Sequence, residues 1–174
     1  MDAARRGFLR GGFLTEEGRS EIARQARPLG PPPPWHRGRL HQETCAACDQ
    51  ACAAACEMGV IAIHEEGHAL AGLPYLHFEA AGCTYCGDCL GACPMDLGEQ
   101  AATTRPQIGL AVLDTARCLA WNGVICMSCQ FACPERAIRA DRQGRPAIDP
   151  APCTGCGQCL APCPEQAIHS TAPA

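Results

Sequence analysis

Residues 153–164 read Cys153-Thr-Gly-Cys156-Gly-Gln-Cys159-Leu-Ala-Pro-Cys163-Pro164, and this stretch decides how the chain folds. Two residues separate each of its first three cysteines, so one short loop can present three thiolates to the same metal group. The fourth cysteine lies four residues after the third, about one helical turn further along. Pro164 biases that cysteine away from helical geometry, so we expect its thiolate to point away from the loop.

The same spacing occurs a second time, at Cys83, Cys86, Cys89, Cys93 and Pro94. It is the ligand spacing of bacterial [4Fe–4S] clusters, in which the fourth cysteine ligates the other cluster of a pair. Structural zinc uses two separated pairs of ligands instead, and disulfides require an oxidising compartment. The spacing therefore predicts four-iron clusters rather than zinc or disulfides.

Two further motifs depart from this pattern. In the third, seven residues separate Cys118 from Cys126; in the first, three residues separate Cys48 from Cys52 and Glu57 replaces the proline. A labile or three-iron first cluster is therefore one alternative. We predict four [4Fe–4S] clusters, with all 16 cysteines as ligands: Cys45, Cys48, Cys52, Cys56, Cys83, Cys86, Cys89, Cys93, Cys118, Cys126, Cys129, Cys133, Cys153, Cys156, Cys159 and Cys163.

An internal repeat organises the chain, because residues 132–139 (ACPERAIR) are matched by residues 162–169 (PCPEQAIH). Turn-forming stretches predict one hairpin with arms at 137–140 and 146–149, and another with arms at 60–64 and 75–79. Each half thus reads as motif, hairpin, motif, with short helices after the cysteine loops. The predicted fold class is α+β, with tandem two-cluster bacterial ferredoxin-like modules at residues 41–113 and 114–174.

Aromatic residues make up only 5% of the chain, so few large side chains can form a conventional core. We expect the clusters to replace it, and the metal-free chain to be largely disordered.

The pairing of motifs has two alternatives. If the second module is a ferredoxin pair, Cys118, Cys126, Cys129 and Cys163 hold one cluster, and Cys153, Cys156, Cys159 and Cys133 hold the other. A nested arrangement would instead pair the first motif with the fourth and the second with the third.

The first 40 residues form a basic arm with eight arginines and four acids, whereas residues 41–174 carry six arginines and 14 acids. Residues 31–34 are four prolines, which predict a stiff spacer between arm and body, and residues 16–25 are a candidate helix. The acidic body would repel phosphates, so we expect no nucleic-acid partner. No stretch approaches the roughly 20 apolar residues of a membrane span, so we expect no integral membrane segment.

Other motifs predict little further chemistry. Arg5-Arg6-Gly7-Phe8-Leu9-Arg10 resembles a twin-arginine export motif, but the charged residues that follow leave no apolar region, which favours a cytoplasmic location. We expect Trp35 and Trp121 to cover apolar gaps. The six histidines show no ligand spacing and are expected on exposed loops. There is no flavin, nucleotide or molybdopterin fingerprint, so the chain is not expected to be an enzyme.

The arginine pair at Arg5-Arg6, the segment Pro33-Pro34-Trp35 and the long-gap third motif occur here together with four cysteine motifs. This layout resembles the NapF family of ferredoxin-type accessory proteins of the periplasmic nitrate reductase system. The resemblance implies a cytoplasmic iron–sulfur protein that acts on the precursor of the catalytic nitrate reductase subunit and assists its maturation before export. A general electron carrier with several redox partners, and an electron-transfer subunit of a quinol-oxidising complex, are the alternatives.

Overall fold

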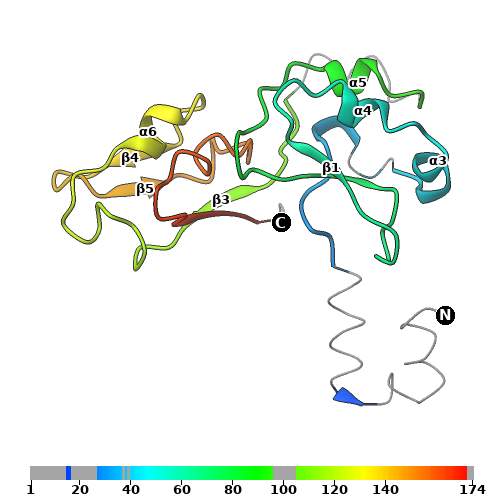
Figure 1. Cartoon of the computed structure of the whole chain (residues 1–174). Coiled ribbons are helices and arrows are strands. Elements are labelled where there is room, and N and C mark those ends of the chain that lie inside the picture. Colours follow the sequence, from blue (N-terminus) through cyan, green and yellow to red (C-terminus); the bar gives the residue numbers. More distant parts are fainter. Residues whose placement is uncertain (1–14, 17–26, 37, 39, 96–104, 172–174) are drawn as a thin grey trace.

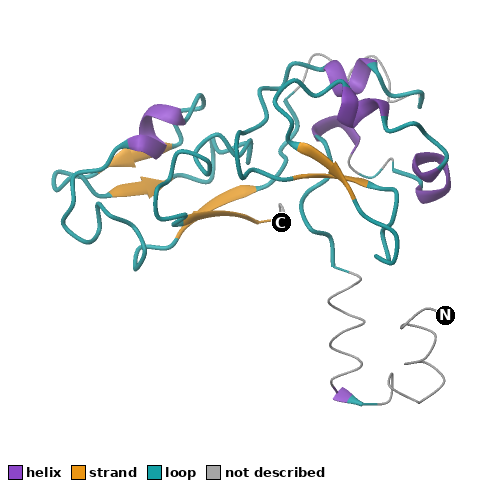
Figure 2. Cartoon of the chain, in the orientation of Figure 1, coloured by secondary structure: helices purple, strands orange, loops and turns teal. Residues whose placement is uncertain are grey.

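The computed structural model describes residues 15–16, 27–36, 38, 40–95 and 105–171. Its mixture of short helices and short strands agrees with the α+β class (Figures 1 and 2). The candidate helix at 16–25 lies almost wholly outside the described residues. In chain order the elements are η2 (Pro34–His36), α3 (Gln42–Ala46), α4 (Ala51–Ala54), β1 (Ile61–Ile63), β2 (Pro74–Leu76), α5 (Asp88–Gly91), β3 (Leu110–Leu113), α6 (Ser128–Ala132), β4 (Ile138–Ala140), β5 (Pro146–Ile148) and β6 (Ile168–Thr171).

Both predicted hairpins are confirmed. β1 pairs antiparallel with β2, with Ala62 opposite Tyr75, and β4 pairs antiparallel with β5, with Arg139 opposite Ala147. The turn between β4 and β5 is closed by the Asp141 carboxylate, which accepts hydrogen bonds from the backbone N–H groups of Gln143 and Arg145, each at 2.9 Å. These hydrogen bonds keep the pKa of Asp141 below its ordinary value.

A third strand pair, β3 with β6, was not predicted from the sequence. Leu110 lies opposite Thr171 and Leu113 opposite Ile168, and Figure 1 shows β3 beside the red strand at the end of the chain. A module boundary at residue 113 would separate these paired strands. We therefore propose that the second module begins before Leu110.

The proline-rich segment is part of the first module. Pro33, Trp35 and His36 are buried, and the Leu76 N–H donates a 2.7 Å hydrogen bond to the Pro31 carbonyl. Trp35 packs edge-on against Tyr85, with ring centroids 6.1 Å apart, as expected for a residue that covers an apolar gap. The interpretation of these prolines as a spacer is therefore wrong for the buried ones, and we propose that the first module begins near residue 30.

Short helices follow the cysteine loops in the first three motifs, where α4, α5 and α6 begin. In the fourth motif, residues 158–162 form consecutive turns instead. Pro162 explains the difference, because it has no N–H to donate within a helix. Among the described residues, none of the helices is both long and apolar enough to span a membrane.

Candidate metal centres

The 16 cysteines gather into four groups of four. Each group combines three cysteines of one motif with the fourth cysteine of the neighbouring motif. We name them site 1 (Cys45, Cys48, Cys52, Cys93), site 2 (Cys56, Cys83, Cys86, Cys89), site 3 (Cys118, Cys126, Cys129, Cys163) and site 4 (Cys133, Cys153, Cys156, Cys159).

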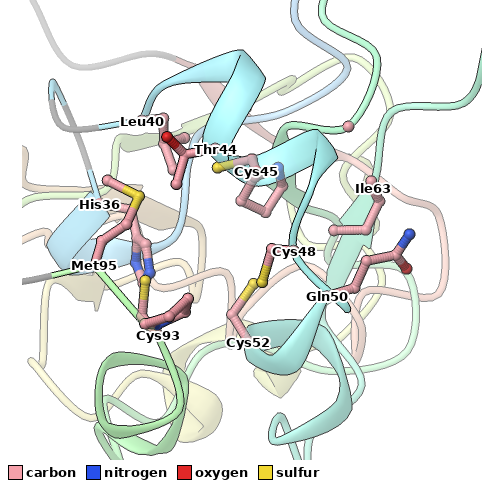
Figure 3. Close-up of a pocket in the computed structure, with 13 residues that line it drawn as sticks. His36, Leu40, Thr44, Cys45, Cys48, Gln50, Cys52, Ile63, Cys93 and Met95 are labelled. Carbon is pink, nitrogen blue, oxygen red and sulfur yellow. The ribbon is translucent and has the colours of Figure 1, made fainter.

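Sites 1, 2 and 4 line cavities, and three cysteines of site 3 share a small apolar cluster. Figure 3 shows the cysteines of site 1 around their cavity. At site 3, Cys118 is buried and Cys126 and Cys163 pack against its cluster. Cys129 lies near enough to all three for their charges to raise its pKa, after the larger effect of burial. The grouping combines the first motif with the second and the third with the fourth, as the sequential arrangement predicts and the nested one does not.

In the third and fourth motifs, the turn after the fourth cysteine explains how its sulfur is held. In the third motif, Arg136 has a positive φ of 51°, and the following residue, Ala137, donates its N–H to the Cys133 sulfur at 3.3 Å. In the fourth motif, Gln166 has a φ of 49° and Ala167 donates to the Cys163 sulfur at 3.2 Å. The repeated Cys-Pro-Glu-x-Ala-Ile segment thus encodes a turn that supplies an amide hydrogen bond to sulfur.

The first motif keeps this turn although Glu57 replaces the proline. Gly59 lies at the same offset from Cys56 and has a φ of 62°, which glycine adopts without strain. Val60 is then buried, as Ala137 and Ala167 are after the later motifs. Gln50, with a φ of 61°, precedes α4 as Gly87, with a φ of 90°, precedes α5, so the extra residue of this motif lies before Gln50.

The long gap of the third motif is closed by a folded loop. The Asn122 side chain donates hydrogen bonds to the carbonyls of Ala116 (3.0 Å) and Cys118 (2.8 Å), so the chain turns back toward Cys126. The Trp121 indole N–H donates to the Pro146 carbonyl at 3.0 Å, which ties the loop to β5. Trp121 is 40% exposed, so it anchors the loop rather than filling a core gap.

The buried thiols are hard to ionise without metal. Burial, followed by the charges of neighbouring cysteines, raises the pKa of Cys89 and Cys159 to about 12, and that of Cys129 to about 11. Metal binds thiolates only, so loading such sites releases protons.

The geometry fits a cluster better than a single ion. Among the described residues, no three His, Cys, Asp or Glu side chains converge tightly enough to hold one metal ion. A tetrahedral zinc site requires all four sulfurs within about 2.3 Å of one atom. Four thiolates spread around a cavity match the outer ligands of a four-iron cluster.

Two histidines differ from the expectation of exposed loops. His64 is 4% exposed; its ring nitrogens make hydrogen bonds with the Leu73 carbonyl (2.8 Å) and the Leu29 N–H (3.3 Å). His36 is 1% exposed, and neither of its ring nitrogens has a hydrogen-bond partner. Burial lowers the pKa of both. The burial of these two histidines could not be predicted from ligand spacing, because it depends on residues that are distant from them in the sequence.

Two family models match the chain. Each describes a 4Fe-4S dicluster domain, one over residues 37–97 and the other over residues 124–168. The chain therefore has [4Fe–4S] clusters as its cofactors, up to four in number, and the tandem arrangement of two-cluster modules is confirmed.

Several known proteins are similar over most of the chain. The ferredoxin-type protein NapF of Escherichia coli strain K12 is 34% identical over 173 residues, which cover 97% of this chain and 94% of that protein. The ferredoxin-type protein NapG of Haemophilus influenzae is 31% identical over 82% of this chain and 57% of its own length. The methylamine utilization ferredoxin-type protein MauM of Paracoccus denitrificans is 34% identical over 81% of this chain and 67% of its own length.

No solved structure matches the chain. The match to NapF extends through both dicluster domains and all four cysteine motifs. The chain belongs to the NapF family of ferredoxin-type iron–sulfur proteins.

Proposed function

We propose that the chain is a cytoplasmic polyferredoxin that carries four [4Fe–4S] clusters, one at each site. Its role is electron transfer during maturation of the catalytic subunit of the periplasmic nitrate reductase, before export of that subunit. It carries no substrate-converting site of its own.

The observation that supports this proposal most is the complete use of the cysteines. The fourth cysteine of every motif lies in the group of the neighbouring motif, and all 16 cysteines belong to one of the four groups. All 16 are free of disulfides. Such a protein dedicates its thiols to cluster binding, which is expected of an electron carrier.

The bound clusters supply reversible one-electron chemistry. The chain holds them, limits their contact with water and directs N–H groups at their sulfurs. Amides such as those of Tyr85, Ala137 and Ala167 donate to cysteine sulfurs at 3.4, 3.3 and 3.2 Å. Hydrogen bonds to sulfur stabilise the more negative, reduced state, and therefore raise the reduction potential.

The partner is tested by a pull-down from anaerobic cytoplasm, with the tagged chain as bait. We expect the precursor of the catalytic subunit to be retained and the mature subunit to be released. Cell fractionation in the same experiment tests the cytoplasmic location.

A variant with one cysteine of each site replaced loses the clusters and the fold that depends on them, so retention of the precursor by this variant would show that the contact is unspecific. If several unrelated redox proteins exchange electrons with the chain and none forms a stable complex, it is a general electron carrier. Recovery in the periplasm with a quinol-oxidising complex would contradict the proposal.

A further inference from the structure

The two modules meet where the loop of the second motif touches the loop of the fourth. The Cys83 N–H donates to the Cys156 carbonyl at 2.7 Å. The Gln158 amide donates to the carbonyls of Gly82 (3.3 Å) and Cys83 (3.4 Å). Cysteine ligands of site 2 and site 4 are thus joined by a direct backbone hydrogen bond.

The backbones of the two loops lie very close together at Gly82. A Cβ atom at Gly82 would overlap the backbone of Gly157 and Gln158, so any larger residue would push the two loops apart. The hydroxyl of Tyr85, in the same loop of the second motif, lies within hydrogen-bond distance of the carbonyls of Pro106 (3.0 Å) and Thr154 (3.2 Å), with its ring half-buried. Leu160 packs against the apolar cores of both modules.

Neighbouring sites also meet within each module. Cys89 of site 2 and Cys52 of site 1 pack in the same apolar cluster, and Cys159 of site 4 and Cys129 of site 3 pack in another. Across the junction, the Cys83 N–H of site 2 donates to the Cys156 carbonyl of site 4. These three contacts link the four sites into one series.

We propose that residues 82–85 and 154–158 couple sites 2 and 4, so that electrons follow the order site 1, site 2, site 4, site 3. This inference rests on the proposed clusters. Because electron tunnelling slows exponentially with distance, the close junction makes sites 2 and 4 the exchange pair between modules. Sites 1 and 3 are then the two ends at which external partners exchange electrons.

The order is tested by electron paramagnetic resonance on two matched double variants. C45A/C118A removes a ligand from sites 1 and 3, and C86A/C153A removes one from sites 2 and 4. About eight iron atoms per chain show that two clusters remain. We expect spin–spin interaction between the reduced clusters of C45A/C118A, and independent signals from C86A/C153A. Independent signals in the first, or interaction in the second, would overturn the order.

The intact chain supplies a second test in case those variants lose all iron. G82A adds a methyl group at the junction, whereas G91A adds one in α5, where nothing lies within 4 Å. We expect G82A to weaken the interaction between clusters without loss of iron, and G91A to leave it unchanged. An unchanged interaction in G82A would contradict the proposal, whereas loss of iron in the parent protein would contradict the clusters themselves.

A separate observation concerns His36. Its ring lines the site 1 cavity, and Figure 3 shows it beside Cys93. Both ring nitrogens are buried without a partner, which is unfavourable for polar groups removed from water. An imidazole carries at least one N–H donor in either protonation state. Sulfur acceptors of a bound cluster would satisfy it.

We infer that His36 donates a hydrogen bond to a sulfide of the cluster at site 1. The donor stabilises the reduced state more than the oxidised state, so it raises the reduction potential of that cluster. The burial of Pro33, Trp35 and His36 in the first module holds the ring in this position. This inference also rests on the proposed cluster at site 1.

The test compares H36L, which removes the donor, with H36Q, which keeps an N–H. His41 provides a matched control, because its side chain is exposed and makes no capping hydrogen bond to α3. In anaerobic redox titrations we expect one of the four clusters to become harder to reduce in H36L, and H36Q and H41L to resemble the parent.

Hyperfine spectroscopy on protein containing ¹⁵N-histidine gives a readout independent of the potential. We expect a weak nitrogen coupling that disappears in H36L. An unchanged potential in H36L, or a coupling strong enough for a nitrogen bonded directly to iron, would overturn the assignment. Iron content measured on every variant distinguishes these outcomes from loss of the cluster.

Discussion

Cys93 belongs to the second motif by sequence and to site 1 by position, and Cys56 makes the reverse exchange. Each is the fourth cysteine of its motif, so its sulfur faces the neighbouring group. Single substitutions can therefore separate membership of a motif from membership of a site.

We predict that C93A has the same spectroscopic defect as C52A, because both remove a site 1 ligand. C89A, from the same motif as Cys93, should have a different defect, at site 2. Electron paramagnetic resonance of the three reduced variants checks this, with iron content as the control. A shared defect of C93A and C89A would contradict the exchange of fourth cysteines.

A second prediction concerns Gly59, which replaces the bulkier residues found at the same offset in the later motifs. It has a φ of 62°, and nothing lies within 4 Å of the place where a Cβ would be. G59A should therefore cost about 1–2 kcal/mol through backbone strain alone, and accelerate iron loss from site 2. G91A, at ordinary backbone angles, is the matched control; equal rates in the two variants would show that the turn is not strained.

At the level of single residues, the sequence predicted the cysteine exchange but not everything around it. Gly59 could have been found by aligning its offset from Cys56 with those of Arg136 and Gln166 from their own fourth cysteines. The burial of His36 could not, because it depends on how residues 33–36 pack onto a distant part of the module.

The two hairpins, whose strands are close in sequence, could be predicted, whereas the pairing of β3 with β6 could not. The two hairpins form around turn residues visible in the sequence, such as Asp141 and Gly144. β3 and β6 lie far apart along the chain, so no turn signals their pairing. Because of this pairing, we propose that the second module begins before Leu110 and not at residue 114.

We predict that a fragment of residues 105–174 assembles two clusters by itself, and that a fragment of residues 114–174 assembles them less stably. The shorter fragment lacks β3, including Leu113, which packs against the apolar residues of sites 3 and 4. Iron content and resistance to protease measure the difference. Fragments of equal stability would show that β3 contributes little, and failure of both would show that the module depends on its neighbour.

At the scale of the whole molecule, the described residues form three small apolar clusters, and cysteines belong to each of them. The sequence predicted this from the scarcity of aromatic residues, and the packed cysteines agree with it. Burial raises the pKa of Cys89 and Cys159 to about 12, so without metal these thiols stay neutral and contribute only as small apolar side chains.

We therefore expect chelation of iron to abolish both the helical circular dichroism signal and resistance to protease. The comparison is with the same protein before chelation and after anaerobic reconstitution, which should restore both. A metal-free chain that still unfolds cooperatively on heating would show that the apolar contacts suffice without clusters.

We propose that each of the four groups of four cysteines holds a [4Fe–4S] cluster. Metal analysis of the intact chain, purified and reconstituted without oxygen, together with assay of acid-labile sulfide, tests this proposal. We expect about 16 iron and about 16 sulfide per chain. About 12 of each would single out one incomplete site, for which site 1, with its widened motif, is the first candidate. Stoichiometric zinc with little sulfide would contradict the proposal.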